Sequence, residues 1–173
     1  AALRRIGLDG SLRGPVPVKV KALREDGGSL RAQVEADLTR AAIDGLLPGF
    51  QKPAGRAGKL TFEATERPKG YAIANLALDS GTASFRGQAD VGQDGAVNSA
   101  RFSLFRLSAG DNVRLDFERS GGGGRATIRG NSFDARPFLR TALQDAAPNA
   151  KAERDIDLDL GHLRGEGISG VGN

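Results

Sequence analysis

The chain of 173 residues contains no cysteine, no methionine and no tryptophan, and it has a single tyrosine. Without cysteine, disulfide frameworks, thiolate zinc sites and cysteine nucleophiles are excluded. Aromatic residues make up only 5% of the chain, too few for the aromatic girdles of a transmembrane barrel. No run approaches 18 consecutive apolar residues, so we expect neither a membrane-spanning helix nor a signal peptide within it.

Strong charge of one sign is also missing. The 25 basic and 21 acidic residues give a net charge of +4, spread along the chain without a run of five like charges. We therefore expect no nucleic-acid partner. Because the first residue is not methionine and the end (GEGISGVGN) is rich in glycine, we expect residues 1–173 to be one β-rich segment of a longer protein.

What the sequence has in abundance is alternation of apolar and polar residues. In 30–38, Leu, Ala, Val, Ala and Leu occupy every second position, with charged or amide residues between them. This period places apolar side chains on one face of a strand and polar side chains on the other. Comparable runs lie near 3–12, 15–24, 60–62, 70–78, 83–91, 97–107, 113–117, 124–130 and 156–160. The pattern predicts about ten strands, antiparallel wherever short turns join them.

Turn residues separate these runs. Asp26-Gly27-Gly28, Asp79-Ser80-Gly81, Gln93-Asp94-Gly95 and Gly121 to Gly124 are sequences that accept positive φ and predict hairpins. The apolar phase switches inside two runs, at Ile73 to Leu76 and at Leu104 to Phe105, where a β-bulge is the usual cause.

Two segments have helical patterns. Thr39 to Leu47 has apolar residues at helical spacing, with Thr39 as the candidate N-cap and Pro48-Gly49 beyond its end. Asp134 to Asp145 repeats this arrangement, with Pro137 in its first turn. Their starts lie about 95 residues apart, so we expect a structural repeat with a boundary near 131–150.

The helices are too small to cover the sheet. Ten strands of about eight residues give roughly 1,250 Å² of sheet per face, whereas two short helices cover about 300 Å². A neighbouring repeat of the same chain, the sheet folded over itself or an apolar ligand must cover the rest. The predicted fold is all-β: a long, curved antiparallel sheet of about ten strands, an open groove or half-barrel, with two short helices.

Four short motifs lie within roughly residues 37–160. They are the G-x-A-x-F-R-G strand at Gly81 to Gly87, the Asp94-Gly95 turn, the S-x-G-D turn at Ser108 to Asp111 and the G-N-S-F-D-A-R-P-F helix entry at Gly130 to Phe138. Together they resemble the AsmA-like superfamily of bacterial envelope proteins. The resemblance implies a long protein that is tethered to the inner membrane by a segment outside this chain. It also implies a periplasmic, groove-forming sheet that conducts or shelters phospholipid or another acyl-chain lipid on its way to the outer membrane.

Two glycine-rich motifs resemble nucleotide sites without completing them. Gly165 to Gly170 spells G-x-G-x-x-G, but no helical pattern follows it. Gly121 to Gly124 lacks the Lys-Ser/Thr pair of a phosphate-binding loop. We expect no cofactor.

Metal and catalytic motifs are also incomplete. Asp155, Asp157, Asp159 and Glu166 imitate a calcium loop, but Leu160 stands where the sharp turn requires glycine. His162, the only histidine, has no recognisable nucleophile and carboxylate around it. We expect no metal site, no catalytic residue and no enzyme.

The apolar strand faces remain as the candidate site. Small inward residues such as Ala64, Ala89 and Ala100 leave room that a self-filling core would give to larger side chains. We expect acyl chains to lie along Phe62, Phe85, Val91, Phe102, Leu104, Val113, Leu115, Phe117 and Ile128. The alternative is a purely structural β module, a solenoid or stalk segment, with a closed core and no ligand.

Overall fold

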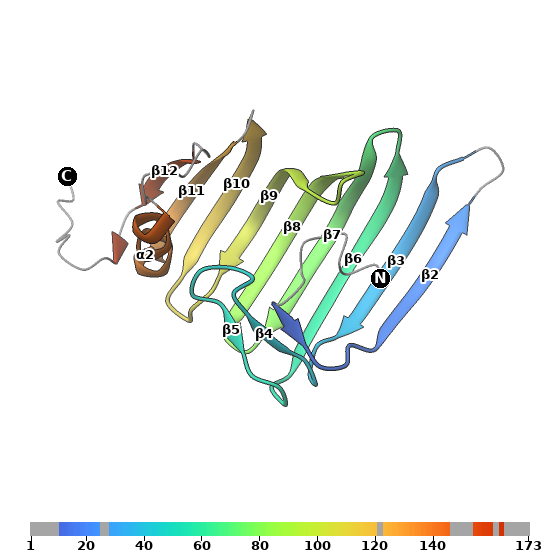
Figure 1. Ribbon diagram of the computed structural model, residues 1–173, viewed down its shortest axis with the longest axis horizontal. Helices are drawn as coiled ribbons and strands as arrows, with labels where there is room; N and C mark the ends of the chain where they lie inside the picture. Colours follow the sequence, from blue (N-terminus) through green and yellow to red (C-terminus); the bar gives the residue numbers. More distant parts are fainter. Residues whose placement is uncertain (1–10, 25–27, 121–122, 146–153, 161–162, 165–173) are drawn as a thin grey trace.

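One large open sheet dominates the computed structural model, which describes residues 11–24, 28–120, 123–145, 154–160 and 163–164 (Figure 1). Its antiparallel strands are β2 (Val18–Arg24), β3 (Leu30–Asp37), β6 (Gly58–Arg67), β7 (Gly70–Ser80), β8 (Ala83–Gly92), β9 (Val97–Arg106), β10 (Asn112–Ser120) and β11 (Gly123–Asp134). They lie side by side in the order β11-β10-β9-β8-β7-β6-β3-β2. Each is antiparallel to its neighbours. Short connections require this for every pair except β3 and β6, which are joined through β4 and β5.

The remaining elements lie beside this sheet. β12 (Arg154–Leu160) extends it in parallel to β11, and β13 (Leu163–Arg164) pairs with the end of β11. β1 (Leu12–Arg13), β4 (Ala42–Asp44) and β5 (Gln51–Lys52) form a small sheet in the order β1-β4-β5. The helix α2 (Arg136–Asp145) follows β11.

The predicted all-β class and the long antiparallel sheet are confirmed, and the sheet is open rather than closed into a barrel. The count of about ten antiparallel strands is not confirmed, because the antiparallel run has eight and β12 joins it in parallel. Gly81 and Gly95 adopt the positive φ of 63° and 80° expected of their turns. Residues 26 and 27 of the first predicted turn and residues 121 and 122 of the last lie outside the described residues, and the repeat boundary near 131–150 stays a prediction.

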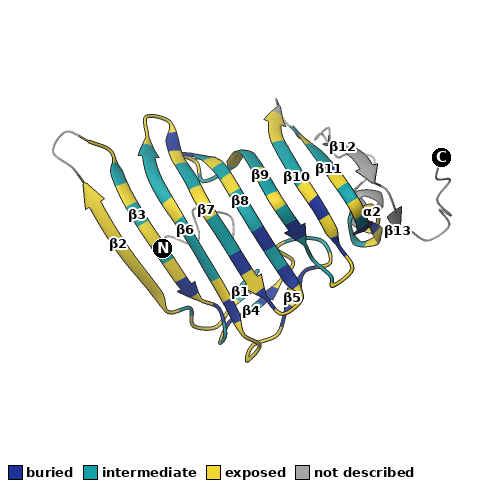
Figure 2. Ribbon diagram, turned by 180° about the vertical axis from the view of Figure 1, so that it is seen from behind, coloured by how far each residue is buried: buried dark blue, intermediate teal, exposed yellow. Residues whose placement is uncertain are grey.

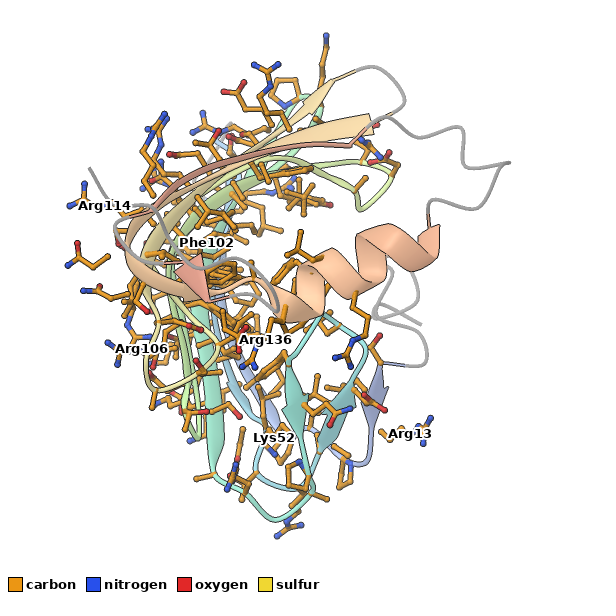
Figure 3. The ribbon with its side chains drawn as sticks, turned by 90° about the vertical axis from the view of Figure 1, so that its left-hand side faces the viewer. Arg13, Lys52, Phe102, Arg106, Arg114 and Arg136 are labelled. Atoms are coloured by element: carbon orange, nitrogen blue, oxygen red, sulfur yellow. The ribbon has the colours of Figure 1, made fainter. Side chains whose placement is uncertain are left out.

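Bulges curve the sheet. The register shifts between Ile73 and Leu76 of β7, where Asn75 has a φ of 51°, a conformation that asparagine tolerates better than most residues. It also shifts at Ser103 of β9. Phe102 and Leu104 pair with Gly87 and Arg86, two consecutive residues of β8, so Ser103 is the extra residue. The first position is the predicted phase switch, and the second lies next to the predicted switch at Leu104 to Phe105. Two further register shifts, at Asp90/Val91 and Asn112/Val113, were not predicted. An extra residue on one strand increases local twist, and Figure 3 shows the sheet edge-on as a curved wall.

The first predicted helix, Thr39 to Leu47, is wrong. β4 lies within this segment, Ile43 is buried and pairs with Leu12 of β1, and Leu46 is exposed. A nine-residue helix is marginal in water by itself, so pairing with β1 and β5 decides the conformation of the segment. Its N-cap candidate does not cap a helix either: the backbone N–H of Thr39 donates to the Asp37 carboxylate at 2.8 Å, closing a turn.

The second predicted helix is confirmed as α2. The N–H of Arg136 donates to the Asp134 carboxylate at 3.2 Å, and the N–H of Leu139 donates to the carbonyl of Ala135 at 2.9 Å. Pro137 stands in the first turn, where a missing N–H is tolerated.

A cluster of six phenylalanines forms the centre of the core. The ring centroids of Phe85 and Phe105, on adjacent strands, lie 4.8 Å apart, and Phe50 of the loop before β5 meets Phe85 edge-on at 6.0 Å. The cluster comprises Phe50, Phe85, Phe102, Phe105, Phe133 and Phe138. Phe138 of α2 closes it against Phe133 at 5.4 Å. The small sheet with its loops and α2 therefore act as a roof over one half of the concave face, and Figure 2 shows most buried residues at that end of the strands.

Two buried charged side chains hold the roof and turns in place. Lys52 of β5 is 2% exposed, and its ammonium donates to the carbonyl of Ala41 at 2.7 Å and more distantly to those of Thr39 and Pro53. Asp111 is 1% exposed, and its carboxylate accepts the backbone N–H groups of three residues, Leu107, Ser108 and Asp134. Buried charges persist where such hydrogen bonds replace water.

Candidate functional site: the open half of the concave face

The half of the concave face that the roof leaves uncovered carries a continuous apolar band. Its ten members are all half-buried, and we call them the open half: Phe62, Ala64, Ile73, Ala89, Val91, Ala100, Phe102, Leu115, Phe117 and Ala126. They come from six strands, β6 to β11, which lie next to one another. Alternation of side chains places every one on the same face, since each strand turns every second residue toward the roof side.

Strand pairing aligns the small residues of the open half in one row across the sheet. Ala64 pairs with Ile73, Ile73 with Ala89, and Ala89 with Ala100. The row continues from Ala100 to Phe117 and from Phe117 to Ala126. The expected inward alanines are therefore neighbours in space, and only Ile73 and Phe117 interrupt the row with larger side chains.

Larger side chains border this row. On the roof side, Phe102 pairs with Leu115 and Leu115 with Ile128. On the other side, Val91 pairs with Tyr71 and with Val97, which are 46% and 41% exposed. A row of small residues between two rows of larger ones suits an elongated apolar ligand that lies across the strands.

Two aromatic rings of the band lie over glycines of the adjacent strands. A Cβ added at Gly124 would stand 2.6 Å from the Phe117 ring, and one added at Gly87 would stand 2.8 Å from the Phe102 ring. The absence of a side chain at these glycines lets each ring lie along the sheet surface. The glycines thus keep the face smooth where its largest side chains are.

The structure divides the nine predicted lining residues into groups. Phe62, Val91 and Phe117 lie on the open half, and Phe102 and Leu115 lie at its border, packed against the core. Phe85, Val113 and Ile128 are buried beneath the roof, with 6%, 2% and 3% exposure. These three residues belong to a closed core and contact no open surface.

Leu104 lies on the opposite face of the sheet from the other eight predicted lining residues. It pairs with Arg86, whereas Phe85 pairs with Phe105, so the bulge at Ser103 turns Leu104 to the outer, convex face. This change of face is the effect of the phase switch that the sequence predicts near Leu104. Figure 3 shows Phe102 inside the curve of the sheet, and Arg106 and Arg114 outside it.

Sequence reasoning missed Ile73 as a member of the open half, and Tyr71 and Val97 as its neighbours. The bulge at Asn75 breaks the alternation of β7, and without the register Ile73 and Leu76 could not both be assigned inward. The signal available was local: Tyr71 and Ile73 keep period two up to the bulge.

The convex face is polar and carries exposed ion pairs. Arg86 bonds Asp79 at 2.6 Å, and this hydrogen bond holds the pKa of the Asp79 carboxyl below its usual value. Arg101 bonds Asp116 at 3.0 Å within a hollow of about 750 Å³ that is lined mainly by polar residues, among them Gln88, Asp90 and Glu118. Both signs of charge mix here, and the apolar side chains assigned to this face, such as Leu104, are separated by charged residues, so the hollow is a weaker candidate for an apolar ligand than the open half.

The described part of the chain has no helix long and apolar enough to cross a membrane. Among those same residues, no group of three or more histidine, aspartate or glutamate side chains is placed to hold a metal ion. The Gly165 to Gly170 motif and His162 lie outside the described residues. The chain matches no protein-family model, no curated protein and no solved structure.

Proposed function

We propose that this chain is a non-catalytic, lipid-handling β segment that shelters acyl chains on the open half of its concave face. The observation that carries the proposal is the half-buried apolar band on a sheet whose roof covers only the other half. Large apolar faces on soluble proteins usually meet an apolar partner. In the wider proposal, the chain is part of an AsmA-like protein in the periplasm, tethered to the inner membrane, that conducts lipid toward the outer membrane.

The dimensions of the band suit a lipid tail. Five strand spacings of about 4.8 Å separate β6 from β11, which gives a band roughly 24 Å long. One tail spans about half of a hydrocarbon core that is about 30 Å thick, or roughly 15 Å. The band is therefore long enough for one tail laid across the strands. Each buried methylene contributes about 0.8 kcal/mol, so a tail in partial contact is held without a polar anchor.

The competing function is a structural β module with a closed core and no ligand. The phenylalanine cluster beneath the roof favours it, because that half of the face is already a packed interior. The two functions make different predictions only for the open half. Lipid handling requires that it be accessible to a ligand, whereas a structural module requires that it be filled by packed side chains.

Arginine substitutions distinguish these functions. In Phe62→Arg and Phe117→Arg the new charge can reach water from an accessible face, so we expect both variants to fold and to lose bound lipid. Leu104→Arg, on the convex face, is the matched control and should fold and keep lipid. Folding is followed by circular dichroism. Lipid is measured by native mass spectrometry of protein purified from bacterial membranes and by titration with a phospholipid that carries a fluorescent acyl chain.

Two results would contradict the proposal. Unfolding of both Phe62→Arg and Phe117→Arg would mean that the charge is buried and that the core is closed. Wild-type protein that carries no lipid after purification and does not bind the fluorescent phospholipid would favour the structural module.

A further inference from the structure

Among the described residues, β2 and β12 are the two edge strands of the large sheet, and they differ in charge. β2 lies at one end and β12 at the other (Figure 1). All seven residues of β2 are exposed, among them Val18 at 52% and Val20 at 58%. An exposed edge strand presents unpaired backbone N–H and C=O groups and is a template for another strand.

The sequence of β2 gives this edge a basic convex side and an apolar concave side. Val18 pairs with Ala36 and Val20 with Val34, which places both valines on the concave face. Lys19 and Lys21 alternate with them and therefore lie on the convex face. Neither lysine forms an ion pair within the part of the chain that the structure describes.

β12 carries the opposite pattern in its sequence, R-D-I-D-L-D-L. Its register sets Ile156 against Ala126 and Leu158 against Ile128, two residues of the concave face, and Asp157 against Thr127 of the convex face. Acidic and apolar positions thus alternate along one edge of the sheet, while basic and apolar positions alternate along the other.

The strand directions fit as well. Seven antiparallel steps lead from β2 to β11, so these two strands run in opposite directions, and β12 is parallel to β11. β12 of one copy would therefore pair antiparallel with β2 of a second copy. In this arrangement the concave faces of the two copies lie on the same side of the continued sheet. Each strand has seven residues. Full overlap places Lys19 opposite Asp159, Lys21 opposite Asp157 and Val20 opposite Leu158. It also places Arg24 opposite Arg154, but Arg24 already forms an ion pair with Glu66 of its own sheet.

We propose that copies of this chain join head to tail by pairing β2 of one copy with β12 of the next, which continues both the sheet and its apolar concave face. At full overlap, pairing of two β2 strands about a twofold axis would set Lys21 against Lys21, and pairing of two β12 strands would set Asp157 against Asp157 and Asp155 against Asp159. Like charges directly opposite destabilise a strand pair, so the edges favour the mixed joint. A head-to-tail joint leaves a free edge at each end, so association continues into open arrays. The proposal does not depend on lipid binding.

Charge reversal at each edge tests the joint in the 173-residue chain. We expect the wild type to associate with rising concentration in analytical ultracentrifugation. Lys19→Glu/Lys21→Glu and Asp157→Lys/Asp159→Lys should each weaken association about tenfold or more, since two attractive cross-strand pairs become repulsive. Mixing the two variants should restore it, because every edge then finds an edge of opposite charge on the other variant. Arg67→Glu/Lys69→Glu, in the exposed β6–β7 turn, has the same charge change as the β2 variant and should associate like the wild type.

A second measurement locates the contact even if a charge variant folds poorly. The chain has no natural cysteine, so Lys21→Cys/Asp157→Cys should form disulfide-linked ladders under oxidation, whereas Arg67→Cys/Asp157→Cys should not. Wild-type chain that stays monomeric at all concentrations would overturn the proposal. So would an Asp157→Lys/Asp159→Lys variant that associates like the wild type, which would indicate a β2–β2 dimer or pairing through another surface.

Discussion

Phe102 and Leu104 are two residues apart in β9, yet they lie on opposite faces of the sheet. Phe102 pairs with Gly87 and Leu115 on the concave face, and Leu104 pairs with Arg86 on the convex face. In a regular strand, residues two apart share a face. The single extra residue at Ser103 therefore decides which of two large apolar side chains joins the core.

This difference predicts unequal effects of the same substitution. Phe102→Thr removes a ring whose centroid lies 6.2 Å from that of Phe85 and 6.0 Å from that of Phe105. We expect it to lower the free energy of unfolding by about 2–4 kcal/mol. Leu104→Thr places a β-branched residue on the convex face and should change it by less than about 1 kcal/mol. Urea denaturation measures both, and equal losses would contradict the assigned faces.

The covered and open halves should also respond differently to loss of a phenylalanine. Phe85 is 6% exposed and touches three other rings, so Phe85→Ala leaves a cavity beneath the roof and should destabilise the fold by about 3–5 kcal/mol. Phe62→Ala, on the half-buried band, should destabilise it by less than about 2 kcal/mol. Thermal and urea unfolding of the two variants provide the comparison. A larger loss for Phe62→Ala would mean that the open half is packed as tightly as the core.

Lys52 should contribute stability that depends on pH. Burial lowers the pKa of its ammonium below the usual 10.5, so between the folded-state pKa and about 10.5 the unfolded chain binds more protons. Stability of the wild type then rises with pH in that window. Lys52→Met removes the donor to the carbonyl of Ala41 and should lower the free energy of unfolding by about 1–3 kcal/mol.

The difference in the free energy of unfolding between the wild type and Lys52→Met should increase as the pH approaches 10.5. Urea denaturation at neutral and alkaline pH measures this difference. Lys59→Met is the matched control. Lys59 has a side chain that is 59% exposed and an ion pair to Glu35, so its loss should change stability by less than about 1 kcal/mol. A deficit of Lys52→Met that is constant or shrinks with pH would contradict the lowered pKa.

Asp111 should be sensitive even to an isosteric change. Each of its two carboxylate oxygens accepts at least one backbone N–H, and the amide introduced by Asp111→Asn would turn its own N–H donors toward one of those backbone donors. We expect a loss of about 1–3 kcal/mol in the free energy of unfolding. Asp116→Asn, at a 40% exposed side chain paired with Arg101, should lose less than about 1 kcal/mol. Similar losses in the two variants would contradict the anchoring role of Asp111.

Sequence alone predicted the β class, the hairpins and the approximate positions of two of the bulges, but not the register shifts at Asn112/Val113 and Asp90/Val91. These features follow from local rules: alternation sets the faces of a strand, and glycine and aspartate set the turns. The helix after β11 was also predictable, because Asp134 and Pro137 provide its start within a few residues. The inward alanines were assigned correctly to one face, since period two holds within each uninterrupted run.

Only the tertiary structure decided the rest, because it depends on partners distant in sequence. Thr39 to Leu47 has a helical pattern, but pairing of Ile43 with Leu12 and Lys52 makes part of it a strand. Phe85 and Phe117 have the same pattern in the sequence, yet only Phe85 lies beneath the roof that Phe50 and α2 help to form. Alternation determines the side of the sheet on which a residue lies. Whether that side is covered depends on where the remaining chain packs.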